Sequence, residues 1–283
     1  MKEGVAKLPD ARLLRVSTLQ FHDSGADAAD EVTLALAGGA AYLRALIVGG
    51  VNVGLAAHTI ALQVAVGRDT FGELCKLRAL RVAWAKVVAA FGADSAGPTP
   101  IHAVCSARTQ STRDSWTNML RVSTQVFAAA IGGADYVAPR GYDEIDGSTP
   151  SALGRRVARN TALVLRDESG LGRVKDAAAG SYFFDSFTDA MAREAWSRFQ
   201  RLESAGGVVA GLGNGSLFAG IEASRRAREE RIAAGHEPIL GVTDFVNEKE
   251  DPLAVPHKVA STSSATATVF ANHRDAESFE GAK

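Results

Sequence analysis

Two histidines lie where a side chain could take part in chemistry. His22 comes at the exit of an apolar segment, residues 13–21, and precedes a short turn. His102 lies within a second apolar segment, "IHAVCS" (101–106). At either place an imidazole could donate a hydrogen bond to a substrate carbonyl or act as a general acid. A structural histidine fits both places as well. Both residues are therefore candidate substrate contacts, and the sequence predicts no catalytic residue.

Other combinations of reactive residues are weaker. Ser106, Asp114 and His102 are the residue types of a hydrolase triad, but the chain has no Gly-x-Ser-x-Gly elbow. The stretch "GLGNGS" (211–216) is rich in glycine but lacks the Lys-Ser/Thr pair of a phosphate loop. It favours a turn before a helix. The sequence therefore predicts neither hydrolase chemistry nor a nucleotide site.

Composition and cysteine usage exclude several classes of function. Cys75 and Cys105 form no Cys-x-x-Cys pair, and no Cys/His group has the spacing of metal ligands, so no metal site is expected. A net charge of −1 gives no electrostatic case for nucleic acid or an anionic membrane. The N-terminus has no apolar signal core, and no run approaches about 18 apolar residues. We expect a cytoplasmic protein with reduced, buried thiols.

The first half of the chain alternates apolar segments with helical patterns. Each apolar segment is short and rich in β-branched residues, and a long stretch with helical spacing follows the first three. This β-α-β-α-β-α-β order predicts a parallel sheet covered by helices. The expected strands are 13–21, 59–66, 101–106 and 135–140, and the expected helices are 28–48, 71–92 and 116–133.

Four βα units form an incomplete object. A closed (β/α)8 barrel needs eight strands and about 250 residues, whereas the alternating part occupies only residues 13–140. Two sheet edges would stay open, and open edges need a cover. Either the missing strands belong to a preceding segment or a partner chain, or the four strands make a small doubly wound sheet. The pattern alone leaves both architectures open.

Beyond residue 145 the alternation stops and helical patterns follow. Residues 154–169 and 216–234 read as helices. Between them, Ser186-x-x-Asp189 resembles a capping box, for a helix closed by Gly206-Gly207. We expect three parts, which are a half barrel over 1–145, a helical extension over 146–250, and a disordered linker or tail over 251–283.

Five segments, in a fixed order, resemble one known family. They are "KLRALRVAWAKV" (76–87), "RDSWTNMLR" (113–121), "GGAD" (132–135), "RRVARNTALVLRDESGLGRVKD" (155–176) and "GSYFFDSFTDAMAREAW" (180–196). Together they closely resemble the methylmalonyl-CoA mutase family over about residues 11–255. Members are adenosylcobalamin-dependent isomerases with a (β/α)8 barrel for the CoA substrate and a C-terminal cobalamin domain. The resemblance implies an α/β fold, in which this chain is the C-terminal half of a TIM barrel followed by a helical extension.

The first matched site position departs from the catalytic chains of that family. Phe21-His22 stand where those chains have Tyr-His. The loop from His22 to Gly25 is shorter than theirs and similar to that of the small, non-catalytic chains. The resemblance therefore implies that His22 is a vestigial substrate contact.

The next two strands depart further. Thr59 and Ala61 stand where catalytic chains have an Arg and a Ser. His102 matches their His, but Val104 replaces a Gln two residues later. These replacements imply that most of the polar pocket in this half is missing, with His102 a second vestigial contact.

The resemblance implies a subunit or fragment of an adenosylcobalamin-dependent acyl-CoA mutase that interconverts methylmalonyl-CoA and succinyl-CoA. We expect this chain to be structural rather than catalytic. The family's Asp-x-His-x-x-Gly cobalamin motif is absent, so we expect no cofactor on this chain alone. The expected partner is a catalytic mutase chain or a first-half barrel segment, or else a second copy. The alternative is a free-standing acyl-CoA-binding module without isomerase activity.

Overall fold

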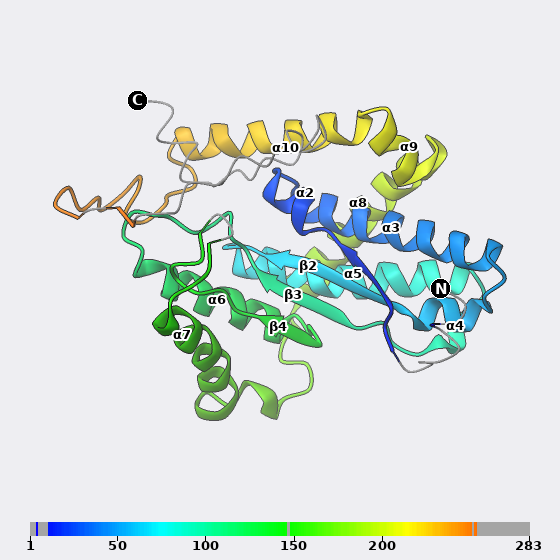
Figure 1. The fold of residues 1–283 in the computed structure, drawn as a ribbon, viewed down its shortest axis with the longest axis horizontal. Helices are drawn as coiled ribbons and strands as arrows, with labels where there is room; N and C mark the ends of the chain where they lie inside the picture. Colours follow the sequence, from blue (N-terminus) through cyan, green and yellow to red (C-terminus); the bar gives the residue numbers. More distant parts are fainter. Residues whose placement is uncertain (1–3, 5–10, 146–147, 251, 254–283) are drawn as a thin grey trace.

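The fold is built on one parallel sheet. The computed structural model describes residues 4, 11–145, 148–250 and 252–253. Its four strands lie in the order β1-β2-β3-β4, and every neighbouring pair is parallel (Figure 1). The predicted parallel sheet is thereby confirmed. The strands are β1 (Leu14–Ser17), β2 (Ile60–Val66), β3 (Ile101–Cys105) and β4 (Tyr136–Ala138).

Three long helices connect the strands and enclose the core. Each follows one strand and leads to the next, as a parallel sheet requires. Strand residues of one parity, such as Leu62 and Ile101, are buried with apolar residues of these helices, such as Leu36 and Leu77. The main core therefore lies between the sheet and its helical layer. The helices are α3 (Ala28–Val48), α5 (Thr70–Ala90) and α6 (Thr117–Ile131).

Helix α3 begins at a cap that the local sequence defines, and it is buried by packing against two other helices. It begins at a capping box, in which the Asp27 side chain accepts from Asp30 N and the Asp30 side chain accepts from Asp27 N. By length and hydropathy it is the one helix in the described residues that could cross a membrane, although 61% of its most apolar window is buried within the fold. It packs against α5 and α8, as expected of a core helix.

The expected strand over 13–21 is too long. Thr18 N donates to Gln63 O of β2, and the next backbone bond, His22 N to Thr18 O, is already helical. Strand β1 therefore ends at Ser17, and the short helix α2 (Leu19–Asp23) holds His22. An apolar run of this length does not distinguish a strand from a strand followed by one helical turn. A second short helix, α4 (Val53–His58), precedes β2 and was also not expected.

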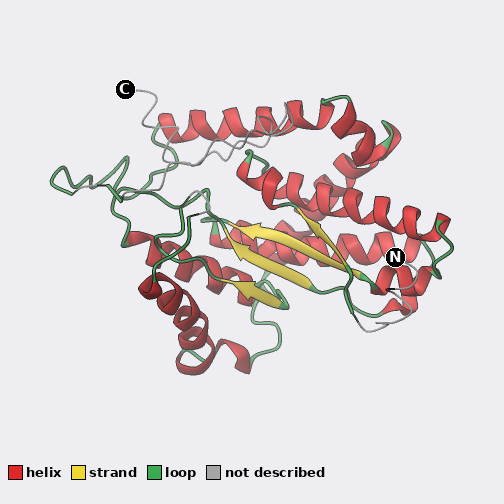
Figure 2. Cartoon of the chain, viewed as in Figure 1, coloured by secondary structure: helices red, strands yellow, loops and turns green. Residues whose placement is uncertain are grey.

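The second half of the described chain is helical (Figure 2). Helix α8 lies across α3 and α5. Its cap is Ser181, which accepts from Phe184 N, while the Ser186 hydroxyl donates to Tyr182 O, so the predicted Ser186 cap is wrong. The expected tail 251–283 lies outside the described residues apart from 252–253. The elements are α7 (Ala152–Leu163), a π-helical turn (Val164–Glu168), a 3-10 turn (Leu171–Arg173), α8 (Tyr182–Ser204), α9 (Gly207–Gly213) and α10 (Ser216–Ala233).

Candidate functional site

A polar row crosses the sheet on the face opposite the helical layer, here called the inner face. The strand register places Ser17 opposite Gln63, Gln63 opposite His102, and His102 opposite Tyr136. One residue from each of the four strands thus stands in a single layer. His102, the second predicted contact, lies at the centre of this row.

Hydrogen bonds join the members of the row. Ser17 Oγ donates to Gln63 Oε1 at 2.9 Å, and Gln63 Nε2 lies 3.0 Å from His102 Nδ1. Because an amide N–H can only donate, Nδ1 accepts and the proton of neutral His102 lies on Nε2. Tyr136 meets the imidazole edge to face at 6.5 Å and is 65% exposed. Nε2–H is therefore a donor available on the inner face.

Two influences lower the pKa of His102 from its ordinary value of 6.5. The larger is partial burial, which disfavours the charged imidazolium, and the smaller is the positive charge of Arg15. His102 is consequently neutral at physiological pH. A neutral imidazole in this position can donate one hydrogen bond to a carbonyl without adding a charge.

Apart from the charged Arg15, the rest of the inner face is small or apolar. Ala61 is paired with Arg15, and the layer above the polar row consists of Ala65, Val104 and Ala138. Ala61 and Val104 therefore face where predicted. Thr59 does not, because it is fully buried at the end of α4 with its hydroxyl donating to Ala56 O.

His22 lies in different surroundings, at the carboxyl end of the sheet and close to α3 and α5. Its side chain is 1% exposed. Nδ1 lies 2.8 Å from Glu31 Oε1, and Nε2 lies 2.7 Å from Ser106 Oγ. The carboxylate fixes the proton on Nδ1, so Nε2 accepts from the serine hydroxyl. Both ring nitrogens are satisfied within the fold, and the side chain does not reach the inner face as a substrate contact would.

Glu31 is the centre of this buried network. Its Oε1 accepts from Lys76 Nζ at 2.8 Å, and its Oε2 accepts from Thr18 Oγ1 at 2.9 Å and from Ala65 N at 3.0 Å. Lys76 is fully buried and also pairs with Glu73. Glu31 on α3 and Lys76 on α5 thereby hold both helices to the ends of the strands.

The charges of the network stabilise one another. Burial raises the pKa of Glu31, but Lys76 and His22 outweigh it, so the net pKa lies well below the ordinary value. Burial lowers the pKa of Lys76, but Glu31 and Glu73 outweigh it and the net shift is upward. Burial, and then Arg108, lower the pKa of His22 more than Glu31 raises it. The folded chain therefore holds an ionised Glu31–Lys76 pair beside a neutral His22.

Ser106, His22 and Glu31 have the connectivity of a hydrolase triad, but their surroundings do not suit catalysis. Ser106 is buried, and the Glu31 charge is already compensated by Lys76. A general-base pair needs a substrate within reach of the hydroxyl. The combination of Ser106, Asp114 and His102, which the sequence did not favour as a triad, is not formed either. Ser106 lies with His22, His102 lies with Gln63, and Asp114 accepts from Thr117.

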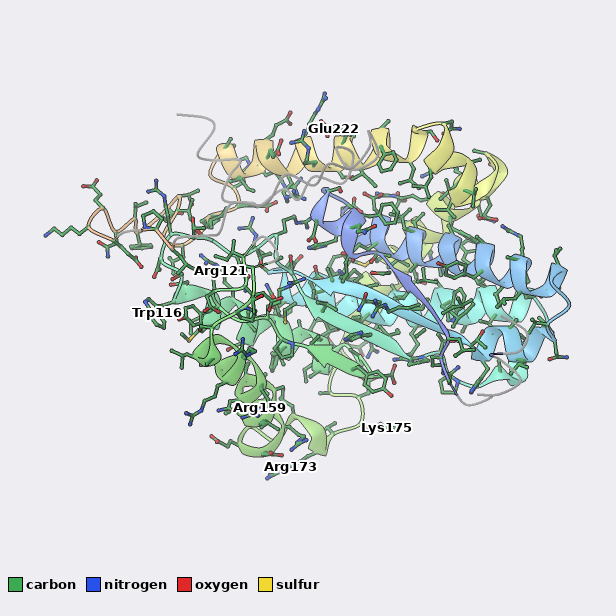
Figure 3. All side chains as sticks on the ribbon, viewed as in Figure 1. Trp116, Arg121, Arg159, Arg173, Lys175 and Glu222 are labelled. Atoms are coloured by element: carbon green, nitrogen blue, oxygen red, sulfur yellow. The ribbon has the colours of Figure 1, made fainter. Side chains whose placement is uncertain are left out.

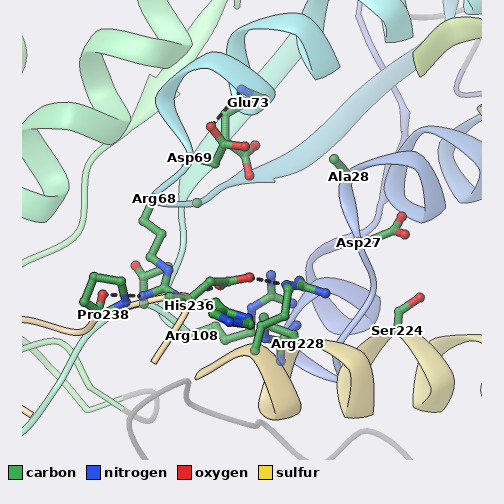
Figure 4. Close-up of a pocket in the computed structure, with 15 residues that line it drawn as sticks. Asp27, Ala28, Arg68, Asp69, Glu73, Arg108, Ser224, Arg228, His236 and Pro238 are labelled. Carbon is green, nitrogen blue, oxygen red and sulfur yellow. Dashed lines mark hydrogen bonds and ion pairs between the residues drawn. The ribbon is translucent and has the colours of Figure 1, made fainter. Parts of the chain in front are cut away.

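A cavity of about 540 Å³ opens near this network at the carboxyl end of the sheet (Figure 4). Arginines from three segments line it, and neither His22 nor Ser106 does. Glu237 bridges Arg68 at 2.6 Å and Arg231 at 2.5 Å, and Arg228 donates to Gly25 O at 3.2 Å. These bonds tie the end of α10 to α2 and to the loop after β2. The charged groups in the cavity wall therefore hold three segments of the chain together.

The described residues contain no group of three or more His, Cys, Asp or Glu arranged to hold a metal ion. Burial raises the pKa of the Cys105 thiol to about 12 and also raises that of Cys75, so neither thiol is activated.

Sequence reasoning missed Gln63, Glu31 and Lys76. Gln63 interrupts the apolar strand "IALQVAV", and a polar residue in a buried strand is a signal for a partner. Lys76 and Glu31 stand in otherwise apolar helix faces, which is the same kind of signal. Their partners are distant in sequence, so spacing could not identify the network.

Comparisons with known proteins agree with this geometry. Residues 4–282 match the family described as methylmalonyl-CoA mutase. The chain is 40% identical over 247 residues to the methylmalonyl-CoA mutase small subunit of Streptomyces virginiae, covering 87% of this chain and 40% of that one. It is 33% identical over 280 residues to the small subunit of Propionibacterium freudenreichii subsp. shermanii, covering 96% and 42%.

A methylmalonyl-CoA mutase of Cereibacter sphaeroides is 30% identical over 251 residues, covering 88% of this chain and 35% of that protein. The chain thus spans about two-fifths of the length of these relatives. A match over nearly all of the chain, together with the parallel α/β sheet, identifies the chain as a member of the methylmalonyl-CoA mutase family.

Proposed function

We propose that this chain is a subunit or fragment of an adenosylcobalamin-dependent acyl-CoA mutase and that its role is structural rather than catalytic. It supplies the C-terminal half of a (β/α)8 barrel. The observation that carries the proposal is a parallel sheet in consecutive strand order with both outer edges unpaired in the described residues. A doubly wound sheet would reverse its strand order at a switch point, whereas consecutive order is that of neighbouring strands in a barrel.

The unpaired edges require a partner. An edge N–H or C=O group that becomes buried without a partner costs about 1–3 kcal/mol, and in the described residues β1 and β4 each present one unpaired edge. The polypeptide that covers them is, in this proposal, a first-half barrel segment or a catalytic mutase chain, with self-association as the remaining option. The small-subunit names of the relatives support a partner chain.

Two features support a structural role. The first predicted contact, His22, is enclosed in an ion network. The inner face offers Ala61 and Val104 where a carbonyl clamp would need donors. The cofactor would supply the radical chemistry, and we assign its binding to the partner, since the sequence lacks the Asp-x-His-x-x-Gly motif and both ring nitrogens of His22 are held by Glu31 and Ser106. We also propose that the chain works in the cytoplasm.

Co-expression tests the proposal. The probe is the part of the Streptomyces virginiae small subunit that lies outside the 247 matched residues. We expect a one-to-one complex by light scattering at micromolar concentration. The isolated chain should neither retain adenosylcobalamin on a desalting column nor isomerise methylmalonyl-CoA. The proposal is contradicted if the chain stays a compact monomer that does not bind the segment. It is also contradicted if the isolated chain retains cobalamin with a base-off spectrum.

One observation favours the alternative, a free-standing acyl-CoA-binding module. The polar row carries the His102 Nε2–H donor and the Tyr136 hydroxyl, and the small side chain of Ala61 lies in the neighbouring layer. A thioester or amide carbonyl could accept from that row. Calorimetric titration of the isolated chain with methylmalonyl-CoA distinguishes the two functions. Saturable binding that His102→Ala abolishes supports the module, and its absence supports the structural role.

A further inference from the structure

A cluster of cations without carboxylate partners lies on α7 and the turns after it. Arg155, Arg156 and Arg159, here called the α7 basic face, are exposed, and Arg173 and Lys175 follow nearby. Figure 3 shows Arg159, Arg173 and Lys175 on the lobe that projects below the sheet. In the part of the chain that the structure describes, Arg155 donates to Pro150 O, and no ion pair involves any of the three arginines.

Most arginines elsewhere on the molecule are paired. Arg78 bonds Asp176, Arg81 bonds Asp135, Arg140 bonds Glu144, and Arg198 bonds both Asp27 and Asp30. On the lobe itself, Arg166 pairs with Asp167, and the Asp176 carboxylate is taken by Arg78. Within the stretch from Arg155 to Lys175, only Glu168 opposes the five remaining cations. The α7 basic face therefore carries positive charge that nearby carboxylates do not neutralise, unlike most arginines elsewhere on the surface.

Exposed aliphatic side chains lie in the same stretch. They belong to Leu153, Leu163, Val164 and Val174. Arginine beside apolar side chains is typical of a protein interface, since Arg is enriched there. Helix α7 packs on α6, and its last turn continues as the π-helical Val164–Glu168, a geometry that is rare and concentrated at functional sites.

The position of α7 identifies the partner. Helix α7 follows β4, the edge strand of the sheet. Any polypeptide that pairs with the free edge of β4 must bring its own covering helix alongside, next to α7. The relatives contain about three-fifths of their length outside the matched region, enough for such a segment.

We propose that the α7 basic face docks an acidic, partly apolar surface of the polypeptide that completes the sheet beyond β4. This inference rests on the proposed function and adds the charge of the partner to it. Carboxylates on that surface would pair with Arg155, Arg156 and Arg159 while its apolar residues cover Leu163 and Val164. The face has no aromatic side chain on which a base could stack, which favours a protein over a single-stranded nucleic acid.

The test measures binding of the Streptomyces virginiae segment described above to the full chain. Arg156→Glu/Arg159→Glu reverses the charge of the face. Arg193→Glu/Arg226→Glu changes the net charge equally on α8 and α10. We expect the first pair to raise the Kd about tenfold or more and the second less than about twofold, and wild-type binding to weaken as NaCl rises from about 0.1 to 0.5 M.

The outcomes distinguish a failure of the docking surface from a failure of the proposed function. Equal effects of the two double variants overturn the docking surface and leave the proposed function standing. No binding by the wild type overturns both. Binding of heparin or anionic vesicles through the α7 basic face, with no effect of the reversal on the segment, shows a polyanion site instead. Circular dichroism of each variant confirms that the fold is unchanged.

Discussion

The two candidate histidines sit in opposite kinds of environment. His22 belongs to a closed network at the carboxyl end of the sheet, where each of its nitrogens has a partner. His102 belongs to a row that crosses the inner face and ends at the exposed ring of Tyr136. Both come from similar apolar segments of the sequence, yet one lies in a fully hydrogen-bonded interior and the other on a partly exposed face of the sheet.

The difference shows which groups need a partner. Burying a charge is tolerated only when it is paired and hydrogen-bonded, and Glu31 meets that condition with Lys76, Thr18 and Ala65 N. The inner face meets a weaker condition, because solvent still satisfies its outward groups. The closed network is therefore satisfied within the chain, whereas the inner face is the surface that a partner would cover in the half barrel that we propose.

The largest expected effect comes from Glu31→Gln. The change removes the negative charge that pairs with Lys76, and it leaves one acceptor oxygen for the four donors that the two carboxylate oxygens now serve. Breaking a buried pair costs about 3–5 kcal/mol, a large share of the roughly 5–15 kcal/mol that separates folded from unfolded domains. Urea unfolding at pH 7 measures it. Asp189→Asn, which breaks the exposed pair with Arg193, is the control and should leave the midpoint of urea unfolding almost unchanged. Similar values for the two variants would contradict the central role of the network.

The next largest effect compares a glycine in the packed core with a glycine on an exposed helix. A Cβ on Gly39 of α3 would lie 2.2 and 2.4 Å from ring carbons of the buried Trp84 on α5. Overpacking of this kind costs about 1–3 kcal/mol, so Gly39→Ala should lower the midpoint of urea unfolding. Gly220→Ala on α10 meets no atom within 4 Å and should stabilise by about 0.5–1 kcal/mol. A neutral result for Gly39→Ala would show that the two helices separate without cost.

The sheet could be predicted from sequence because parallel strands that are buried on both faces are near-continuous apolar runs. The three long helices were also predictable, because each has apolar residues at helical spacing. Two of them also begin at an Asp that caps them locally, Asp27 for α3 and Asp69 for α5. The end of β1 was not, because Thr18 is the last residue to bond β2 and only the tertiary structure shows it.

The candidate site was predictable only in part. His102 was placed on the right strand, and alternation along that strand then fixes its direction. His22 was assigned to a substrate face, but its direction depends on Glu31 and Ser106, which lie 9 and 84 residues away in the chain. Long-range hydrogen bonds of this kind leave no periodic trace in a sequence.

A pH series tests the neutral state of His22. Burial and Arg108 lower its folded pKa below the unfolded value of about 6.5. The unfolded chain then binds more protons below that pH, so this part of the stability is complete above about pH 6.5 and is lost as the pH falls. The free energy of unfolding of the wild type should decline from pH 7.5 to 5.5. His22→Asn should be about 1–3 kcal/mol less stable at pH 7.5, with a flatter decline. An unchanged slope would mean that the pKa of His22 is the same in the folded and the unfolded chain.

The smallest effect on stability is expected from His102→Ala, and it separates the two regions most clearly. Ala removes the acceptor of Gln63 Nε2, but Ser17, His102 and Tyr136 of this row are at least partly exposed, so water can take its place and the isolated chain should lose under about 1 kcal/mol. In the barrel that we propose, the row would be enclosed, and an unsatisfied Gln63 amide would cost about 1–3 kcal/mol. Binding of the Streptomyces virginiae segment should therefore weaken about tenfold, whereas Arg15→Gln, which keeps the Gln63 bond, should change it less. If His102→Ala instead destabilises the isolated chain by more than about 2 kcal/mol and leaves binding unchanged, the inner face is already complete within this chain and needs no barrel partner on that side.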